Sequence, residues 1–243
     1  VTRLDAMASR SAQYRVEWQA LHYLAHPNAS LGRATIEEAL QLLKAEHLPE
    51  PRSAHGTEQT GGCRVTGRMM VTGAIVYDWL YPLLTGEEKK AFVAELIRLA
   101  KTQECGYPPI RGGAITGHGS EAMMLRDMLS AGIAIYNEYP KMYDLTAGRI
   151  LREHVPARNW SYPGHAHHQG DSYGPYRYQW DTFSLFIFDR LGAGNIYSPE
   201  QQFVPYHWLY TTRPDGQRIR SGDTFWDSKP RGIPWGESLG VLL

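Results

Sequence analysis

Apolar residues recur every three or four positions along most of the chain, which is the spacing of helices that bury one face. Helices are predicted over residues 4–25, 35–45, 64–84, 121–137, 140–154 and 176–191, with another beginning after Thr85 and a short one over 199–210. Strand-like alternation is not found before residue 206, and Arg213-Pro214-Asp215-Gly216 is typical of a turn between two strands. The pattern predicts an all-α protein with a short β region near the C-terminus.

Local signals set the predicted helix boundaries. Thr35 followed by Glu38 matches a capping box at a helix start. Thr85 precedes two glutamates, whose charges favour the positive end of a helix. Pro156 predicts the end of the helix before it. Segments rich in Pro, Gly, Ser and Thr predict long loops at 49–63, 105–117 and 156–170.

The order of the elements predicts the architecture. Helix follows helix in antiparallel pairs, with long loops where pairs meet. Such pairs form either an open solenoid or a closed toroid. Because no sequence repeat is visible, we expect the α/α toroid over residues 1–210, with residues 211–243 as a turn and strand region.

The composition excludes several classes of protein. An apolar content of 42% excludes a disordered chain, and 25 basic against 25 acidic residues give no sign of a surface for nucleic acid or anionic lipid. No apolar run is long enough for a membrane span, and no secretory signal peptide is visible. The excess of 15 Tyr and 7 Trp over 6 Phe fits rings that stack on sugars while their polar tips bond hydroxyls.

His118 and Glu121 stand three residues apart in a glycine-rich stretch. If a helix begins near Gly119, both side chains lie at one helix end, where the histidine can act as a general base and a neutral acid can donate a hydrogen bond. The alternative is that His118 and Ser120 cap the helix and Glu121 completes the cap.

Tyr173 lies in a turn over residues 170–175, and Arg177 follows one helical turn later. A phenol is a poor base in water, but a nearby cation such as Arg177 favours the phenolate. The alternative is that Tyr173 belongs to an aromatic packing layer with Tyr162, Tyr176 and Tyr178.

Three histidines, His165, His167 and His168, gather on one loop. Zinc binding is one interpretation, but no acidic or cysteine ligand stands at a familiar spacing. Contact between His167 or His168 and a substrate is therefore favoured.

Several arginines border the same loops, and guanidinium groups suit carboxylate and sulfate oxygens. They are Arg64, Arg111, Arg126 and Arg177. Some of them must instead pair with Asp127, Asp171 or Asp181, and the sequence leaves the two uses open.

Three stretches together resemble the helical domain of heparinase II and the wider heparinase II/III-like polysaccharide lyases. They are Gly117-His118-Gly119-Ser120-Glu121, then His167-His168-Gln169-Gly170-Asp171-Ser172-Tyr173 with Arg177, and Pro205-Tyr206-His207-Trp208-Leu209-Tyr210. The resemblance spans most of the chain. It implies an incomplete α/α toroid followed by large antiparallel β-sheet domains.

The resemblance also implies a reaction. The family removes the C5 proton of a uronate and expels the C4 oxygen, which leaves a 4,5-unsaturated sugar from heparin- or heparan sulfate-like polymers. His118 and Tyr173 are similar to the family's catalytic histidine and tyrosine, and Glu121 to the acid that neutralises the uronate carboxylate. The residues expected to bind substrate are Arg64, His167, Gln169 and Arg177.

The family's β-sheet domains are missing from the 243 residues, so we expect the chain to be part of a longer protein. In heparinase II those domains carry a further catalytic histidine and a structural zinc, so no cofactor or metal is expected in this chain. The expected partner is an acidic polysaccharide, without nucleic acid or membrane partners, and a homodimer is compatible. The resemblance implies a periplasmic or secreted location.

Other classes of function remain open. α/α toroids also host glycoside hydrolases, which need two carboxylates, and Glu121 and Asp171 are the candidates. An alginate-type lyase would perform the same elimination on another polymer. A non-catalytic sugar-binding protein would keep the aromatic residues and arginines but tolerate Tyr173→Phe.

Overall fold

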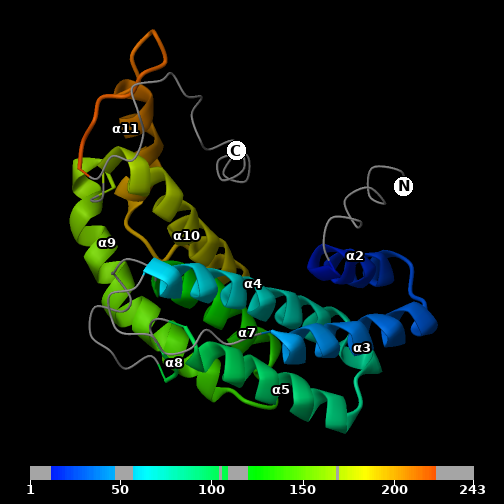
Figure 1. Ribbon diagram of the computed structural model, residues 1–243. Coiled ribbons are helices and arrows are strands. Elements are labelled where there is room, and N and C mark those ends of the chain that lie inside the picture. The colour runs from blue at the N-terminus through cyan, green and yellow to red at the C-terminus, as the bar shows by residue number, and fades with distance from the viewer. Residues whose placement is uncertain (1–11, 47–56, 104–105, 109–119, 168–169, 223–243) are drawn as a thin grey trace. The chain divides into compact units, whose positions relative to one another are not determined.

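The computed structural model describes residues 12–46, 57–103, 106–108, 120–167 and 170–222, with only the backbone at 57–65, 120, 171, 172 and 176 (Figure 1). These residues are mostly helical, which confirms the all-α prediction. Contacts divide the chain into two compact units, Val1–Gly148 and Arg149–Leu243. The sequence pattern predicts a domain boundary between residues 210 and 211 instead.

Elements labelled η are short 3-10 or π segments. The described helices of the first unit are α2 Ala12–Ala25, α3 Ala29–Ala45, α4 Thr57–Trp79, η1 Tyr81–Leu83, α5 Gly86–Lys101, α6 Ser120–Ala122, η2 Met123–Met128, α7 Leu129–Ala134 and α8 Lys141–Arg149. The last residue of α8 is the first residue of the second unit. Those of the second unit are η3 Ile150–His154, α9 Val155–Ser161, η4 Tyr162–Gly164, α10 Gly170–Arg190, η5 Pro199–Phe203 and α11 Val204–Tyr210. Within the described ranges, no helix is long and apolar enough to cross a membrane.

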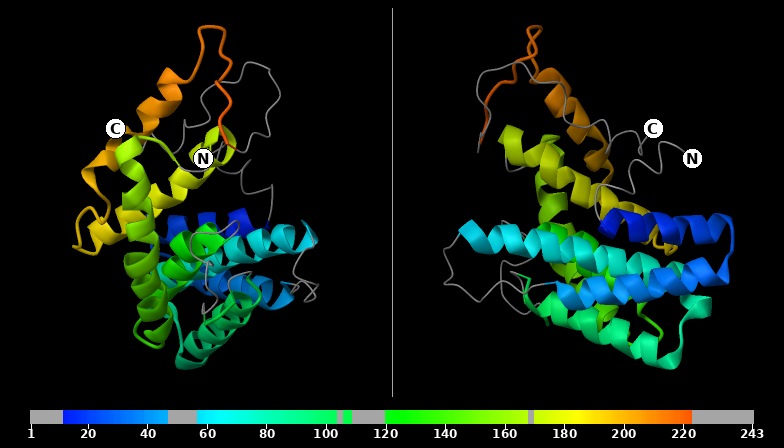
Figure 2. Two further views of the ribbon diagram at one scale, coloured as in Figure 1. Left: turned by 90° about the vertical axis from the view of Figure 1, so that its left-hand side faces the viewer. Right: turned by 45° about the vertical axis from the view of Figure 1, so that its right-hand side comes forward.

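Helix α4 is the centre of the first unit, where it packs against α2, α3, α5 and α7 (Figure 2). Close approach depends on Gly73, because a β-carbon there would lie 3.2 Å from Leu43 and 3.1 Å from Leu96. Most of the buried side chains are aliphatic, aromatic and methionine groups, which stabilise the unit by removing apolar surface from water. They include Ile36, Met70, Tyr77, Phe92, Leu99 and Met124.

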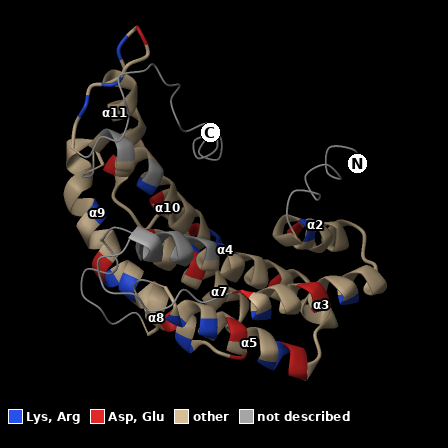
Figure 3. Cartoon of the chain, viewed as in Figure 1, with Lys and Arg blue, Asp and Glu red and all other residues tan. Residues whose placement is uncertain are grey.

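The capping prediction at Thr85 is confirmed. The Thr85 hydroxyl accepts a hydrogen bond from the Glu88 backbone N–H at 3.3 Å, and the Glu88 carboxylate accepts one from the Thr85 N–H at 2.9 Å. Lys/Arg and Asp/Glu residues alternate along the exposed side of α5 (Figure 3). This helix therefore begins and faces water as its sequence predicts.

The capping prediction at Thr35 is wrong. Helix α3 begins at Ala29, where Asn28 Oδ1 accepts a hydrogen bond from the Leu31 N–H at 3.0 Å. Thr35 is buried inside the helix, and its hydroxyl donates to the Leu31 carbonyl at 2.8 Å. A threonine can return its hydroxyl bond to the previous turn in this way, so it did not have to mark a helix start.

The predicted loops at 49–63 and 156–170 are partly helical. Helix α4 begins at Thr57, and helical structure runs through Pro156 as far as Gly164. Pro156 is the second residue of α9, which directly follows the π segment η3, and such segments accommodate irregular backbone hydrogen bonding inside helices. The proline therefore does not end the helix.

Helix α10 begins at Gly170, earlier than the predicted start at Tyr176, and it contains Pro175. Its predicted end at Gly192 is confirmed, since Gly192 is left-handed, with φ +86, and the Ala193 N–H bonds the Phe188 carbonyl at 2.9 Å.

The predicted short helix over 199–210 is formed by η5 and α11. The predicted turn at 213–216 is confirmed by the Arg213 N–H bond to the Gln217 carbonyl at 2.6 Å. In the described part of the chain, the β region is reduced to one antiparallel bridge between Thr212 and Arg218.

Candidate functional site

The predicted site residues fall in both units. Glu121 belongs to the first unit, whereas His167, Tyr173 and Arg177 belong to the second. His118 and Gln169 lie outside the described residues, and for Arg64 the structure describes only the backbone, in α4. Each unit therefore holds its own part of the predicted site.

Tyr173 and Arg177 are brought together on α10. The guanidinium carbon of Arg177 lies over the Tyr173 ring, 4.7 Å from its centroid. Arg177 is only 2% exposed, while Tyr173 is half-buried, so the charge lies inside the protein and the tyrosine is partly open to water. A desolvated cation on an aromatic face is held more strongly than an exposed one. The predicted pair, one helical turn apart, is confirmed as a direct contact.

Two tyrosines of the alternative aromatic layer pack against Tyr197 and Trp208. The Tyr162 ring packs edge-on against Tyr197 at 5.9 Å, and the Tyr178 ring packs edge-on against Trp208 at 5.4 Å. These two tyrosines of the alternative thus serve other packing contacts, and the side chain of Tyr176 lies outside the described part of the chain.

The histidines of the 165–168 loop differ in burial. His167 is 4% exposed and lies against α10, where a β-carbon at Gly174 would be 3.2 Å from the His167 β-carbon. His165 is exposed. Among the described side chains, no group of three or more His, Cys, Asp or Glu residues could hold a metal ion.

The entrance to α10 needs its glycine. Gly170 has φ +76, and a β-carbon there would lie 2.0 Å from the Ser221 carbonyl oxygen. The chain after α11 therefore passes directly over the start of the helix that carries Tyr173.

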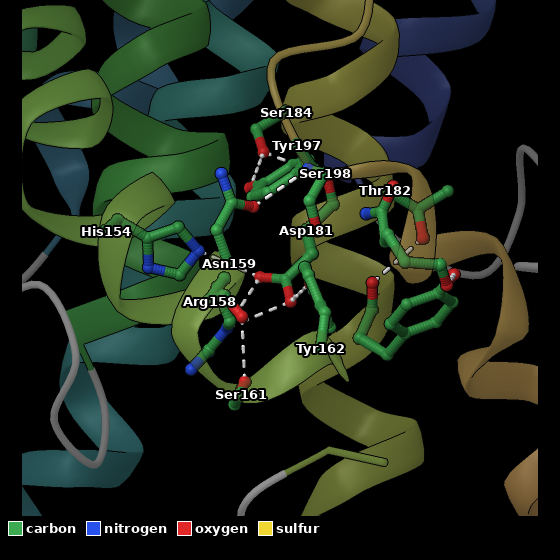
Figure 4. A network of polar contacts seen from close by, with 12 residues as sticks. His154, Arg158, Asn159, Ser161, Tyr162, Asp181, Thr182, Ser184, Tyr197 and Ser198 are labelled. Carbon is green, nitrogen blue, oxygen red and sulfur yellow. Dashed lines mark hydrogen bonds and ion pairs between the residues drawn. The ribbon is translucent and has the colours of Figure 1, made fainter. Parts of the chain in front are cut away.

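One turn beyond Arg177, Asp181 is the centre of a fully buried polar network (Figure 4). Its carboxylate contacts His154 Nε2 at 2.9 Å, Arg158 Nε at 2.9 Å and the Tyr162 hydroxyl at 2.6 Å. Ser184 and Tyr197 share a 2.7 Å hydrogen bond beside it. These contacts join α10 to η3, α9 and η4.

The network keeps Asp181 ionised. Burial by itself disfavours the charge, but Arg158 and the hydrogen bond from His154 outweigh it and hold the pKa of Asp181 well below its usual range. His167 contributes in the same direction. The negative charge therefore lies inside the protein on the same helix as Tyr173, one helical turn beyond Arg177.

In the first unit, Glu121 lies at the start of a helix, as predicted from Gly119. It is the second residue of α6, and its side chain is 1% exposed. Asp127, in the following π segment, is also buried and pairs with Arg126. Burial raises the pKa of Asp127 to about 6, although Arg126 opposes the shift.

The expected pairing of arginines with aspartates is confirmed for Arg126 and Asp127. For Asp181 the partner is Arg158, which the sequence pattern did not mark as a candidate. The sequence did hold a signal, since His154 and Arg158 are four residues apart and share one helix face. It did not indicate which carboxylate they would meet.

No family model matches the chain, and no curated protein matches it.

Proposed function

We propose that the protein is a polysaccharide lyase that cleaves uronate-containing glycosaminoglycans of the heparin or heparan sulfate type by β-elimination. The proposal rests on the three sequence stretches that resemble the heparinase II/III-like lyases. The observation that carries it is the buried Arg177 guanidinium on the face of the Tyr173 ring. This contact supports the role of Tyr173 in the proposal, because it holds the tyrosine ring in a fixed orientation on α10.

In the proposed reaction, a base removes the C5 proton of a uronate and the C4 oxygen leaves with a proton. The C4–O bond breaks and a C4=C5 double bond forms, without water. In a glucuronate both events occur on one face of the ring, and Tyr173 serves as base and then as acid. In an iduronate they occur on opposite faces, so His118 takes the C5 proton and Tyr173 protonates the leaving oxygen.

Glu121 acts on the uronate carboxylate in this proposal. As a neutral acid it donates a hydrogen bond while enolate-like charge develops. Its buried position at the start of α6 supports this role, because excluding water strengthens such a bond. Arg64, His167, Gln169 and Arg177 are proposed to bind the substrate.

The helical pairs are proposed to form an incomplete (α/α) toroid. The pairing of α2 with α3 and of α4 with α5 supports this arrangement within the first unit. A crystal structure of the protein would test it, and an open superhelical stack of the pairs would contradict it.

The reaction is tested by incubating the protein with heparan sulfate and following the ultraviolet absorbance of unsaturated uronates. Tyr173→Phe should lower the rate by about a hundredfold or more, because it removes the transferable proton. Tyr178→Phe is the matched control: it lies on the same helix, and its hydroxyl donates to the Gln201 carbonyl at 2.9 Å. This control should retain activity.

Three outcomes would contradict parts of the proposal. New reducing ends without absorbance would indicate a hydrolase that uses Glu121 and Asp171. Binding without any product, unaffected by Tyr173→Phe, would indicate a sugar-binding protein. If His118→Ala reduced glucuronate and iduronate cleavage equally, the division of work between His118 and Tyr173 would be wrong.

A further inference from the structure

Four aromatic rings that the proposed reaction does not use form an exposed row in the second unit. The row consists of His165, Phe203, Tyr206 and Tyr210, and we call it the aromatic row. Successive ring centroids are 4.9, 6.4 and 6.5 Å apart, and the last two rings are stacked, with 24° between their planes. Tyr206 is 52% exposed and Tyr210 is 79% exposed.

The row follows from the helical period of η5 and α11. Gln201, Val204 and Trp208 are spaced by three and four residues, and all three are buried. Phe203, Tyr206 and Tyr210 have the same spacing, so they form a second face. This second face is aromatic although it is exposed to water. When a helix buries one apolar face and exposes a second one, the exposed face is a candidate binding surface.

The first ring of the row is held by an unusual backbone conformation. His165 ends η4 with φ +49, in the left-handed region that non-glycine residues seldom adopt. This conformation places its ring 4.9 Å from Phe203. Such unfavourable geometry concentrates at functional positions.

The row is anchored to the helix that carries Tyr173. Trp208, on the buried face of α11, lies 3.5 Å from where a Gly174 β-carbon would be. Its ring packs edge-on against Tyr178, and the Tyr178 hydroxyl bonds the Gln201 carbonyl at 2.9 Å. A ligand held by the row is therefore held at a fixed position relative to α10.

We infer that the aromatic row binds a linear uronate-containing polysaccharide chain, with successive sugar rings stacked on successive side chains. The spacing of the rings is comparable to one pyranose unit. Two of them are tyrosines, which offer a flat apolar face together with a hydroxyl for the sugar.

Charge near the row favours an acidic chain. Exposed Arg220 follows Tyr210 in the chain, and the Ile219 N–H bonds the Thr211 carbonyl at 2.7 Å, which draws Arg220 back toward the end of α11. Exposed Arg213 pairs with Asp215 at 2.9 Å, so the charge argument rests on Arg220. Arginine forks suit carboxylate and sulfate groups. The ligand class rests on the proposed function, but binding at the row requires no catalysis.

The test is calorimetric titration of a heparin decasaccharide into the full chain carrying Tyr173→Phe, which prevents turnover. Tyr206→Ala and Tyr210→Ala should each weaken binding about tenfold, because each removes one stacking ring. Tyr206→Phe and Tyr210→Phe keep the ring and should lose less than about threefold. Circular dichroism checks that each variant is folded.

Two control variants separate sugar stacking on the row from a general effect of removing an exposed side chain. Tyr136→Ala removes a tyrosine of the first unit that is 47% exposed and packs edge-on against Tyr143, so it matches Tyr206 in type and exposure. Leu209→Ala removes an exposed apolar side chain from α11 itself. Both should leave the affinity unchanged.

The inference is overturned if no binding is measured, if the alanine variants bind as tightly as the parent, or if Tyr136→Ala causes the same loss. It is also overturned if Leu209→Ala weakens binding as much as Tyr206→Ala does. If these variants change self-association in sedimentation without changing the affinity for sugar, the aromatic row is a protein interface and the inference is again wrong. If binding depends on these rings but the protein with Tyr173 intact forms no unsaturated products, the inference about the aromatic row holds and the proposed lyase activity is wrong.

Discussion

The two units bury different chemistry. The first packs apolar side chains such as Phe92 and Leu96 around α4 and buries Asp127 beside Arg126, whereas the second joins His154, Arg158 and Asp181 in one fully buried polar network. Apolar burial depends mainly on volume and tolerates several arrangements. A buried polar network is satisfied by one arrangement only. The second unit therefore gains a defined orientation for α10, which carries Tyr173 and Arg177.

Charges in the first unit mostly form ion pairs near the surface. Arg33 pairs with Glu88 at 2.5 Å, and the Arg33 side chain is 46% exposed. Such pairs contribute little to stability because water and salt screen them. Asp127 is the buried counterpart of Asp181, but the two carboxylates differ in the direction of their pKa shifts.

The largest expected effect on stability comes from removing the negative charge of Asp181 from the polar network. Asp181→Asn keeps the shape of the side chain but leaves Arg158 buried without its counter-charge. We expect the free energy of unfolding of the second unit to fall by about 3–5 kcal/mol. Urea denaturation followed by hydrogen exchange of α10 peptides measures the change.

Asp189→Asn is the control for this substitution, because Asp189 is exposed on the same helix. It should change stability by less than about 0.5 kcal/mol. Equal effects of the two substitutions would show that the network does not hold the second unit together.

A smaller effect is expected from conservative changes in the two interiors. Tyr162→Phe removes a hydroxyl that donates to Asp181 at 2.6 Å, so it should cost about 1.5–3 kcal/mol, the range for hydrogen bonds to charged groups. Leu96→Met in the first unit keeps the volume and should cost less than about 1.5 kcal/mol. Thermal unfolding measures both losses of stability. If Leu96→Met cost more than Tyr162→Phe, the proposed difference between the two interiors would be wrong.

The two buried carboxylates should give opposite pH dependence. An unfolded aspartate titrates near pH 3.9. Because the folded pKa of Asp127 is raised to about 6, the unfolded state loses its proton first, and stability of the first unit falls as pH rises from about 4 to 6. Asp127→Asn should therefore stabilise this unit above pH 6 by about 1–3 kcal/mol.

Asp181 has a lowered folded pKa, so its contribution is complete above about pH 4 and is lost as pH falls below that value. Hydrogen exchange of the second unit below pH 4 measures the Asp181 effect, and hydrogen exchange of the first unit between pH 4 and pH 8 measures the Asp127 effect. A first unit whose stability rises with pH over this window would contradict the assignment for Asp127.

The smallest expected effect concerns a helix end. Thr85→Ala removes the side-chain half of the capping box on α5 and should cost about 1 kcal/mol. Thr85→Ser keeps the hydroxyl and should cost less. Denaturant midpoints of the two variants measure the difference, and equal values would mean that the cap does not stabilise the first unit.

The sequence by itself determined the features that depend on neighbouring residues. These are the all-α class, the cap at Thr85, the helix end at Gly192, the turn at 213–216, and the contact between Tyr173 and Arg177. Each involves groups within about one helical turn, and capping and turn preferences act over that distance. The pattern was misleading at Thr35 and Pro156, where local preference allowed more than one structure.

Only the tertiary structure decided which distant groups meet. Asp181 finds its partners 19 to 27 residues away in the chain, and their choice depends on how α10 packs. Tertiary packing also buries Trp208 while leaving Tyr206 and Tyr210 exposed on the same short helix. Residue type does not show which of these rings is buried, because each ring is apolar on its face and polar at its tip. The neighbours that pack against the helix determine which rings are exposed to water.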